Sequence, residues 1–379
     1  GPWGLDQVYN KINQGSIWTY SGLSELWVMG GDNDKGQLGQ NDLVFRSSPT
    51  QIPGSTWSQG EGTLYGSAVI RTDGTLWSWG YNIYGILGQN QPSNANYSSP
   101  VQIPGTNWAY VTVGQTQMAA TKTDGTLWAW GSNQRGQLGQ NQGPAQLHSI
   151  SSPVQIPGTT WSKINTGNGR SFGIKTDGTA WSWGYNNYGY LAINSNTQRS
   201  SPVQIPGTTW KHINDGQYHA SAVKTDGTLW TWGYEGQGAL GQNNLIRYSS
   251  PVQIGGGTDW EYVASGNYTN FAVKTNGELW VWGYNNYGQL GVNSRTNYSS
   301  PIQLPGTWGT ESGKIDADYF GHSFAVKTDG TLWTWGRDHN GELGQNSRVS
   351  KSSPVQVGSR TGWDKVGAGD RGALAFIFQ

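Results

Sequence analysis

The sequence predicts an all-β protein that folds as a seven-bladed β-propeller with four antiparallel strands in each blade. Three recurring features support this prediction: a Leu-Trp pair, a Ser-Ser-Pro triplet that follows it, and a lone Trp a few residues beyond each Pro. Each feature occurs seven times and returns about every fifty residues. A repeat of this length is typical of propellers and related arrays, in which each repeat forms one supersecondary unit.

The three features stay in register along the whole chain. The Leu-Trp pair ends at Trp27, Trp77, Trp128, Trp181 (after Ala180 in place of Leu), Trp230, Trp280 and Trp333. The triplet ends at Pro49, Pro100, Pro153, Pro202, Pro251, Pro301 and Pro354. The lone Trp lies at Trp57, Trp108, Trp161, Trp210, Trp260, Trp308 and Trp363. Independent features that keep step with one another fix the number of repeats at seven.

Within a repeat, local signals place four short strands, as in the one that begins with the fourth lone Trp. We expect its first strand near residues 210–213 and its second at residues 220–225. The Asp-Gly pair at Asp226 favours a two-residue turn with positive φ, which leads into a third strand at residues 228–232. Ser-Ser-Pro then opens a fourth strand at residues 252–254, where a Pro at the strand start removes no ladder hydrogen bond.

Packing between blades explains the many Trp residues. A four-stranded sheet of this size cannot bury both faces alone, whereas seven sheets around one axis cover one another. Trp230 and Trp232 lie two residues apart on one strand and therefore share a face. Large rings that recur in every repeat are typical of a core, in which each ring buries roughly 150–250 Å².

The two ends of the chain are expected to complete one blade together. After Trp363 only two strand-like segments follow, residues 363–367 and 373–378, which is half a blade. The strand at Trp27 and the strand after Pro49 would supply the other half. We therefore expect a single propeller over residues 24–379 and an extension over residues 1–23. In that extension Gly1-Pro2 resembles a protease-cleavage scar, and residues 17–20 imitate a second strand.

Composition excludes several classes of partner. The formal net charge is zero, with 23 basic and 23 acidic residues and no basic run, which argues against nucleic acid as a partner. The chain has no Cys, so disulfides, thiolate metal sites and Cys nucleophiles are excluded. No apolar run approaches the roughly 18 residues of a membrane span, and we expect no membrane partner.

Candidate catalytic and metal-binding residues are few. His219 and His322 fit structural hydrogen bonding better than catalysis. Asp32 and Asp34 resemble the start of a calcium loop, but the closing Glu is missing. The Asp residues of the repeated turns are turn formers rather than paired carboxylates: Asp73, Asp124, Asp177, Asp226 and Asp329. No nucleophile, base and orienting group stand together, so we expect no enzyme activity, no cofactor and no metal site.

Residues 222–242, with Thr-Asp-Gly-Thr-Leu-Trp-Thr-Trp-Gly followed by Gly-Ala-Leu-Gly-Gln, resemble the repeat of the regulator of chromosome condensation family. A Gly-Gln-Leu-Gly step at residues 36–39, 136–139 and 288–291 strengthens the resemblance, and variants begin at Gly85, Gly238 and Gly341. The resemblance implies a propeller fold and several possible activities, since the family includes a nucleotide exchange factor, a plant ultraviolet photoreceptor and a bacterial β-lactamase inhibitor. The near-identical, Cys-free repeats, which are rich in Asn, Gln, Ser and Thr, are most similar to bacterial and phage members.

The loops between Leu-Gly-Gln-Asn and Ser-Ser-Pro differ most from one repeat to the next, while equivalent loops share one face. Arg and Tyr in these loops combine flat apolar surfaces with strong hydrogen-bond donors, as in binding hot spots. The predicted binding residues are Phe45, Arg46, Tyr97, His148, Arg199, Arg247, Tyr248, Arg295, Tyr298, Arg348 and Lys351. The competing interpretation is that these loops are solvated connections whose Tyr residues pack on the neighbouring blade.

These observations favour a non-enzymatic recognition or structural propeller. We expect a bacterial or phage surface or virion component that takes part in host recognition and binds a protein or glycan through one face. It would act outside the cell and could belong to a larger appendage. Two alternatives stay open: a lectin with one sugar pocket per blade, lined by Trp and Asn, and a regulatory partner of the guanine-nucleotide-exchange type.

Overall fold

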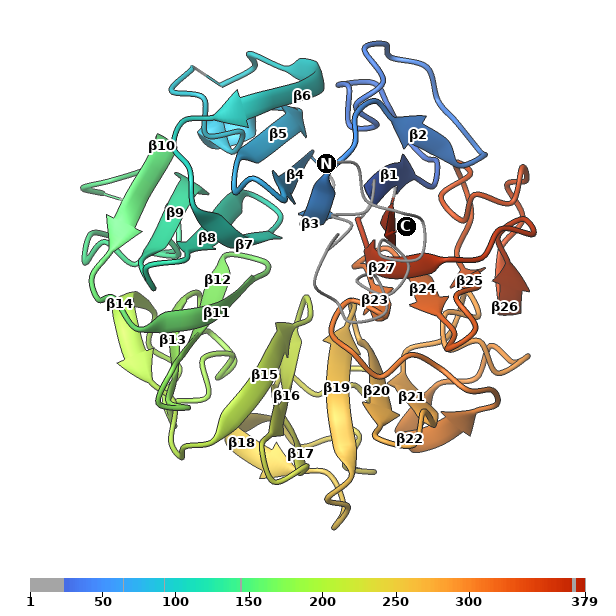
Figure 1. Ribbon diagram of the computed structural model, residues 1–379. Helices are drawn as coiled ribbons and strands as arrows, with labels where there is room; N and C mark the ends of the chain where they lie inside the picture. Colours follow the sequence, from blue (N-terminus) through green and yellow to red (C-terminus); the bar gives the residue numbers. More distant parts are fainter. Residues whose placement is uncertain (1–23, 64, 92, 144, 370–372, 379) are drawn as a thin grey trace, which may run out of the picture.

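Seven four-stranded antiparallel sheets surround a central axis in the computed structural model, which describes residues 24–63, 65–91, 93–143, 145–369 and 373–378 (Figure 1). The predicted seven-bladed propeller is confirmed. In each blade the first strand lies next to the axis and the fourth forms the outer edge (Figure 1). Among the described residues no helix is long and apolar enough to cross a membrane.

The first six blades each use four consecutive strands. Blade 1 contains β3 (Trp57–Gly62), β4 (Gly66–Arg71), β5 (Leu76–Gly80), the 3-10 turn η1 (Ile83–Gly85) and β6 (Tyr97–Ile103). Blade 2 contains β7 (Trp108–Val113), β8 (Gln117–Lys122), β9 (Leu127–Ser132) and β10 (Ser149–Ile156). Blade 3 contains β11 (Trp161–Thr166), β12 (Arg170–Lys175), β13 (Ala180–Gly184) and β14 (Arg199–Gln204).

The next three blades repeat this order. Blade 4 contains β15 (Trp210–Asp215), β16 (His219–Lys224), β17 (Leu229–Gly233) and β18 (Tyr248–Gln253). Blade 5 contains β19 (Trp260–Ser265), β20 (Thr269–Lys274), β21 (Leu279–Gly283) and β22 (Tyr298–Leu304). Blade 6 contains β23 (Ile315–Ala317), β24 (His322–Val326), β25 (Leu332–Gly336) and β26 (Lys351–Gln356).

Blade 7 closes the ring with strands from both ends of the chain, as predicted. It contains β27 (Trp363–Gly367), β28 (Leu374–Phe378), β1 (Ser24–Val28) and β2 (Thr50–Ile52). β1 pairs with β28 so that Leu26 lies opposite Phe376, and both side chains are buried. The predictions for residues 1–23, including the cleavage scar at Gly1-Pro2, lie outside the described residues.

In blades 1 to 6 the fourth strand begins earlier than the sequence suggested. In blade 4 it starts at Tyr248 rather than Val252, because Tyr248 already pairs with Gly233. The pairing register shifts between Thr231 and Gly233, and Pro251 falls within this irregular part of the ladder. A Pro inside a strand is tolerated at such a bulge because the missing N–H would not have joined the ladder.

Each repeated turn forms a local hydrogen-bond network. The Asp226 carboxylate accepts hydrogen bonds from the backbone N–H of Thr228 at 3.0 Å and from its hydroxyl at 2.7 Å. The same hydroxyl accepts a hydrogen bond from the Trp230 indole at 2.7 Å. The Lys224 ammonium lies 4.6 Å from the Trp210 ring and 4.4 Å from the Trp230 ring. The repeated sequence Thr-Asp-Gly-Thr-Leu-Trp is therefore used for structure.

Blade boundaries use the remaining repeated residues. Trp232 is fully buried and donates a hydrogen bond to the carbonyl of Tyr190 in the preceding blade at 2.9 Å. Gly238 lies so close to blade 5 that a Cβ atom there would stand 2.7 Å from the Cα of Ser299. The Asn243 N–H donates to the Ser299 carbonyl at 2.8 Å. This contact between the glycine-rich loop of one blade and Ser-Ser-Pro of the next joins blades all around the ring.

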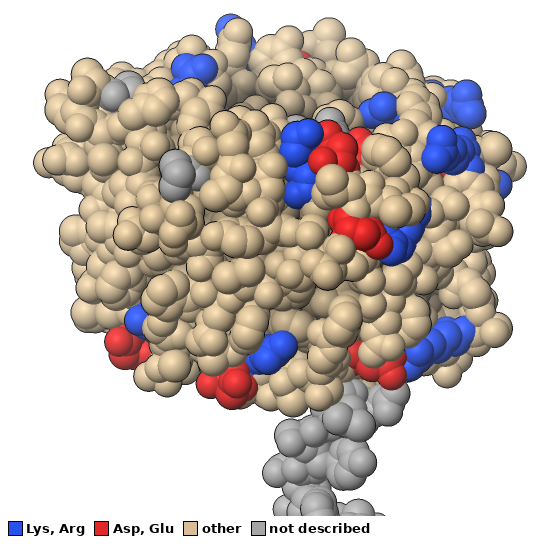
Figure 2. Space-filling model, turned by 90° about the horizontal axis from the view of Figure 1, so that it is seen from above, with Lys and Arg blue, Asp and Glu red and all other residues tan. Residues whose placement is uncertain are grey.

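The two ends of the propeller differ in their connections. One end, the loop face, carries the connections between first and second strands and between third and fourth strands. The other end, the turn face, carries the Thr-Asp-Gly turns and the connections from one blade to the next. Seen from the side, most of the wall is uncharged, and charged residues form a few small clusters (Figure 2).

Candidate functional site

The predicted binding residues all lie on loops, or at the first residue of a strand, between the third and fourth strands of their blades. They are distributed over every blade at the outer edge of the loop face. One blade contributes Phe45 and Arg46, and the opposite side of the ring contributes residues such as Arg199 and Arg247. The structure therefore brings these residues to one face but spreads them around its rim.

Several of them have side-chain partners in their own blade or in the neighbouring blade. Arg46 forms an ion pair with Asp42 at 2.6 Å, and this hydrogen-bonded pair lowers the pKa of Asp42 to about 2. The Tyr248 hydroxyl accepts a hydrogen bond from Asn244 at 3.2 Å. The guanidinium of Arg247 lies 5.4 Å from the ring of Tyr188. Of the predicted binding residues, five are exposed: Phe45, His148, Arg247, Arg295 and Arg348.

Two of the predicted tyrosines pack as the competing interpretation proposed. Tyr97 is half-buried against apolar residues of blades 1 and 2, and Tyr298 is half-buried against those of blades 5 and 6. Lys351 and Arg199 are half-buried at the first residue of β26 and of β14. These side chains contribute to the rim of the loop face more than to a concave site.

A tyrosine cluster lies on the loop face, on blades 3 to 5, and sequence reasoning missed it. Tyr218 and Tyr268 stack with ring centroids 4.6 Å apart and planes within 12°. Tyr234 contacts both of these rings and also Tyr188, at 5.3 Å. The cluster comprises Tyr185, Tyr188, Tyr190, Tyr218, Tyr234 and Tyr268. Its signal in the sequence was partial: only Tyr185 and Tyr188 belong to a Gly-Tyr-Asn-x-Tyr-Gly loop, which resembles another element of the repeat.

A cavity of about 400 Å³ lies beside this cluster on the loop face. Tyr287 and Phe320 on its wall are each 36% exposed, and Arg337 lies 5.6 Å from the ring of Tyr287. Aromatic rings and amide side chains form most of the lining, which comprises Gln115, Gln217, Tyr218, Asn267, Tyr284, Tyr287, Gln289, Tyr319, Phe320, Gly321 and Arg337. The cavity thus spans loops from blades on different sides of the axis.

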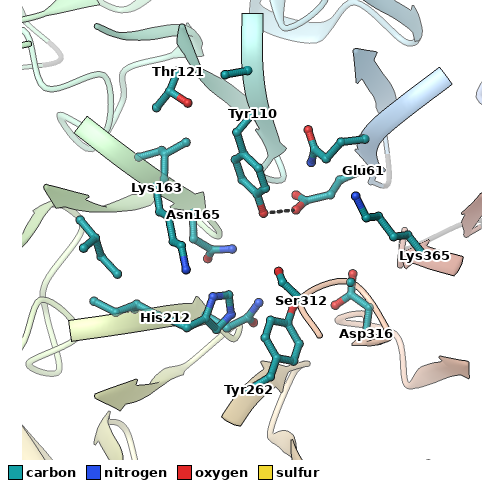
Figure 3. Close-up of a pocket in the computed structure, with 18 of the residues that line it drawn as sticks. Glu61, Tyr110, Thr121, Lys163, Asn165, His212, Tyr262, Ser312, Asp316 and Lys365 are labelled. Carbon is teal, nitrogen blue, oxygen red and sulfur yellow. Dashed lines mark hydrogen bonds between the residues drawn. The ribbon is translucent and has the colours of Figure 1, made fainter. Parts of the chain in front are cut away.

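The axis itself is a channel with a cavity of about 540 Å³ lined by the innermost strands (Figure 3). In every blade but the sixth, the side chain two residues beyond the lone Trp contributes to a mouth ring nearer the turn face: Gln59, Tyr110, Lys163, His212, Tyr262 and Lys365. Side chains four residues beyond form a deep ring, nearer the loop face, which in blades 1 to 4 comprises Glu61, Thr112, Asn165 and Asn214. In blade 6 the deep-ring side chain is Asp316, on the short first strand β23.

Deep-ring side chains join neighbouring blades. Glu61 accepts hydrogen bonds from the Thr112 hydroxyl at 2.9 Å and the Val113 N–H at 3.1 Å. The Asn165 side chain accepts a hydrogen bond from the Asp215 N–H at 2.8 Å, and the Asn214 side chain accepts one from the Ser265 N–H of blade 5 at 2.9 Å. Asp316 accepts from the Ala368 N–H at 2.8 Å. Each of these polar side chains satisfies a backbone donor of the next inner strand, which is a structural role.

The channel narrows toward the loop face, where Tyr319 crosses it. The Tyr319 hydroxyl donates a hydrogen bond to the Asp215 carbonyl at 3.3 Å, and its own carbonyl accepts one from Asn267 at 3.0 Å. A residual space of only about 50 Å³ remains at this end. Asp215 pairs with the buried Arg170 guanidinium at 2.8 Å. Tyr319 therefore separates the channel from the cavity on the loop face.

Burial alters the titration of the channel groups. It raises the pKa of the Glu61 carboxyl and raises that of Asp316 to about 8, where the Glu61 charge adds to the effect. Burial, together with the nearby Lys163 ammonium, lowers the pKa of His212 to about 3. Burial also lowers the pKa of Lys163. At neutral pH His212 is therefore neutral and Asp316 is largely protonated.

The two histidines singled out in the sequence are held in internal hydrogen bonds. His219 is buried, and its Nε2 lies 2.9 Å from the Asn270 side-chain oxygen. His322 is buried between Asp318, which it contacts through Nδ1, and Glu342, 3.6 Å from Nε2. Asp34 pairs with Lys35 at 3.1 Å. In the described part of the chain no group of three or more His, Cys, Asp or Glu side chains could hold a metal ion.

Family comparison agrees with this architecture. A model of the RCC1-like domain matches residues 23–317, which is most of the chain. The chain belongs to the RCC1-like domain family. A second model, of the regulator of chromosome condensation (RCC1) repeat, matches residues 329–376 of the same propeller. The resemblance drawn from the repeat motif is thereby confirmed.

Individual relatives of this RCC1-like propeller are distant. The ultraviolet-B receptor UVR8 of Arabidopsis thaliana is 27% identical over 175 residues, which cover 45% of this chain and 39% of that protein. The human WBSCR16 structure has a TM-score of 0.84 at 18% identity and covers 94% of this chain and 100% of its own. Prp20p of Saccharomyces cerevisiae has a TM-score of 0.78 at 17% identity, with 96% and 92% covered.

These likenesses to solved structures show the propeller fold. The chain spans well under half the length of the curated relatives that it matches.

Proposed function

We propose that this RCC1-like propeller is a non-enzymatic recognition module that binds a partner protein through its loop face. The tyrosine cluster and the adjacent cavity carry this proposal. They place exposed aromatic rings, amide groups and an Arg at the centre of the face, and the predicted rim residues surround them. Tyr and Arg at the centre of a patch, with polar residues around them, are typical of protein-binding hot spots.

Exposed apolar side chains on the same face support a macromolecular ligand. Leu245 is 82% exposed, and Leu43, Val44, Ile246 and Val349 on equivalent loops are also exposed. The described turn face, by contrast, is occupied by hydrogen-bonded turns that recur in nearly every blade. Prp20p, which shares the fold, has binding properties toward Gsp1p and histones. A protein partner of this chain is a proposal by analogy with that relative.

Site-specific crosslinking followed by titration tests this proposal. A photocrosslinking amino acid at position 287 on the loop face should capture the partner, whereas the same group at position 159 on the turn face should not. The captured partner is then purified and titrated by calorimetry. Tyr287→Ala and Arg337→Ala should each weaken the dissociation constant about tenfold or more, equivalent to about 1.4 kcal/mol.

Thr159→Ala is the matched control, because Thr159 is exposed on the turn face. Equal crosslinking from both faces, or a dissociation constant unchanged in both loop-face variants, would overturn the proposal.

A lectin is the second candidate, because two grooves occur at the same place in different repeats. One groove, of about 370 Å³, lies beside Trp260 and Trp280, and the other, of about 360 Å³, lies beside Trp27 and Trp363. Aromatic walls with a nearby cation suit stacking of sugar rings. Multivalent binding to one simple sugar on a glycan array would place this function ahead of protein binding.

We also propose a bacterial or phage surface setting, supported by the Cys-free repeats rich in Asn, Gln, Ser and Thr. An exchange-factor role is tested directly by nucleotide release from candidate GTPases. Release stimulated by this chain would favour that role over passive recognition.

A further inference from the structure

The axial channel carries chargeable groups at two depths. Lys163 and Lys365 belong to the mouth ring, whereas Glu61 and Asp316 belong to the deep ring, two strand positions farther in. Figure 3 shows these side chains directed toward the same open centre from different blades. Because each strand residue advances by about 3.3 Å, the two levels are about 7 Å apart along the axis.

The deep carboxyl groups lack a cationic partner. The hydrogen bonds of Asp316 come from the backbone N–H groups of Ala317 and Ala368. One Glu61 oxygen accepts the hydrogen bonds from Thr112 and Val113 of blade 2. The other oxygen accepts only a long hydrogen bond of 3.5 Å from the Tyr110 hydroxyl. Within the described part of the chain neither carboxyl forms an ion pair. Both side chains are half-buried in the channel wall, where an added cation can pair with them.

His212 supplies an independent sign of a ligand. This side chain lines the channel, is only 8% exposed, and its Nε2 has no hydrogen-bond partner among the described residues. The His212 imidazole forms one hydrogen bond, with the backbone of Val263. Since the ring is neutral at physiological pH, Nε2 offers a hydrogen-bond acceptor. A buried polar atom without a partner is an exception in folded proteins and calls for a donor.

We propose that the channel binds a small zwitterion, with a primary ammonium group between Glu61 and Asp316 and a carboxylate near Lys163 and Lys365. The phenol rings of Tyr110 and Tyr262 face the same space and stabilise a cation through their π-surfaces. The cavity of about 540 Å³ lies within the range of small-molecule sites.

The position of Tyr319 sets the orientation of the ligand. Because this residue closes the loop-face end, a ligand enters from the turn face and meets the two lysines first. Its ammonium end then continues to the carboxyls. A molecule with only one of the two charges would leave one level of the channel without its partner.

Titration calorimetry with three probes tests the charge arrangement. The probes are 5-aminopentanoate, pentylamine and pentanoate, which share a chain length but carry both charges, only the ammonium or only the carboxylate. The zwitterion should bind at least tenfold more tightly than either other probe. Equal affinities for all three, or no binding at millimolar concentration, would overturn the proposal.

Isosteric variants assign the binding to the channel. Glu61→Gln and Asp316→Asn retain an oxygen for the neighbouring backbone N–H, so the blades remain joined. Each should weaken 5-aminopentanoate binding at least tenfold, and Lys365→Met should remove the preference over pentylamine. Glu261→Gln is the control, because Glu261 pairs with Lys211 at 2.5 Å and does not line the channel. Wild-type binding in both carboxyl variants would contradict the assignment.

Proton release gives a second readout that a general loss of folding cannot imitate. The bound ammonium stabilises ionised Asp316, so binding at pH 7 should release up to one proton per ligand. The released fraction follows from the heat measured in buffers of different ionisation enthalpy. Asp316→Asn should abolish this release, and an unchanged release in that variant would count against the site.

Discussion

Two Trp residues lie two positions apart on the third strand in six of the seven repeats, and they have different environments. Trp232 is fully buried and donates its indole N–H to the preceding blade. Trp230 is half-buried and donates to Thr228 within its own turn. The first ring therefore connects blades, whereas the second completes a local network.

Replacing these rings separates the two roles. Trp232→Phe should lower the free energy of unfolding by about 2–4 kcal/mol, because it leaves a cavity and an unpaired carbonyl at Tyr190. Trp230→Phe, the matched control, should cost about 1 kcal/mol, since its site is partly open to solvent. Urea denaturation followed by circular dichroism measures both, and equal losses would contradict the distinction.

Asp316 makes stability depend on pH with a definite sign. Its pKa is raised to about 8 in the folded protein, whereas an unfolded Asp titrates near 3.9. Between these values the folded state holds more protons than the unfolded state, so the contribution of this residue to stability falls as pH rises. The stability difference between wild type and Asp316→Asn should therefore shrink from pH 5 to pH 8. Thermal unfolding at several pH values measures it, and a constant difference would refute the assignment.

At the level of elements, the contact between a glycine-rich loop and the next Ser-Ser-Pro strand determines how blades meet. Gly238 has φ of +84° and no room for a Cβ atom against Ser299. This contact explains why two features separated in sequence keep the same period. A residue on either side can change only if the blade boundary moves.

Gly238→Ala should destabilise the protein by about 2–3 kcal/mol, since the new methyl group meets backbone atoms and the left-handed φ disfavours Ala. Gly256→Ala is the control, because nothing lies within 4 Å of a Cβ atom at that position. The control should change stability by less than about 0.5 kcal/mol. Denaturant titration of both variants is the measurement, and similar effects would argue against close approach as the cause.

At the level of the whole molecule, closure depends on blade 7. β1 pairs with β28 over five residue pairs, from Ser24 with Phe378 to Val28 with Leu374. Without β27 and β28, the apolar faces of blades 1 and 6 that pack on blade 7 would be exposed. The ring thus holds the two ends of the described propeller together.

Truncation after residue 362 should abolish cooperative unfolding and the near-ultraviolet signal of the packed Trp rings. The expected physical reason is exposure of apolar surface on both sides of the missing half-blade. Scanning calorimetry measures the cooperativity. Removing residues 1–23 is the companion experiment, and retention of the full transition is expected from the predicted domain boundary at residue 24.

Local patterns in the sequence were sufficient for the fold. Asp226-Gly227 specifies a turn, and alternating Trp residues specify a buried strand face, because both signals act over a few neighbouring residues. The start of the fourth strand was predicted too late, since Tyr248 pairs with Gly233 across an irregular ladder. The residues before Pro251 were not predicted as strand, because a Pro in a sheet usually stands at the first position of a strand.

The sequence by itself determined the repeat, the seven blades, the turns and the closure by both ends, since repeated short-range patterns encode them. Only the tertiary structure decided which side chains meet at the axis and on the loop face. Glu61 and Asp316 lie far apart in the chain and come to one channel because ring closure brings their strands around a common axis. The tyrosine cluster forms for the same reason: each blade contributes ordinary loop residues, and only their convergence creates a surface.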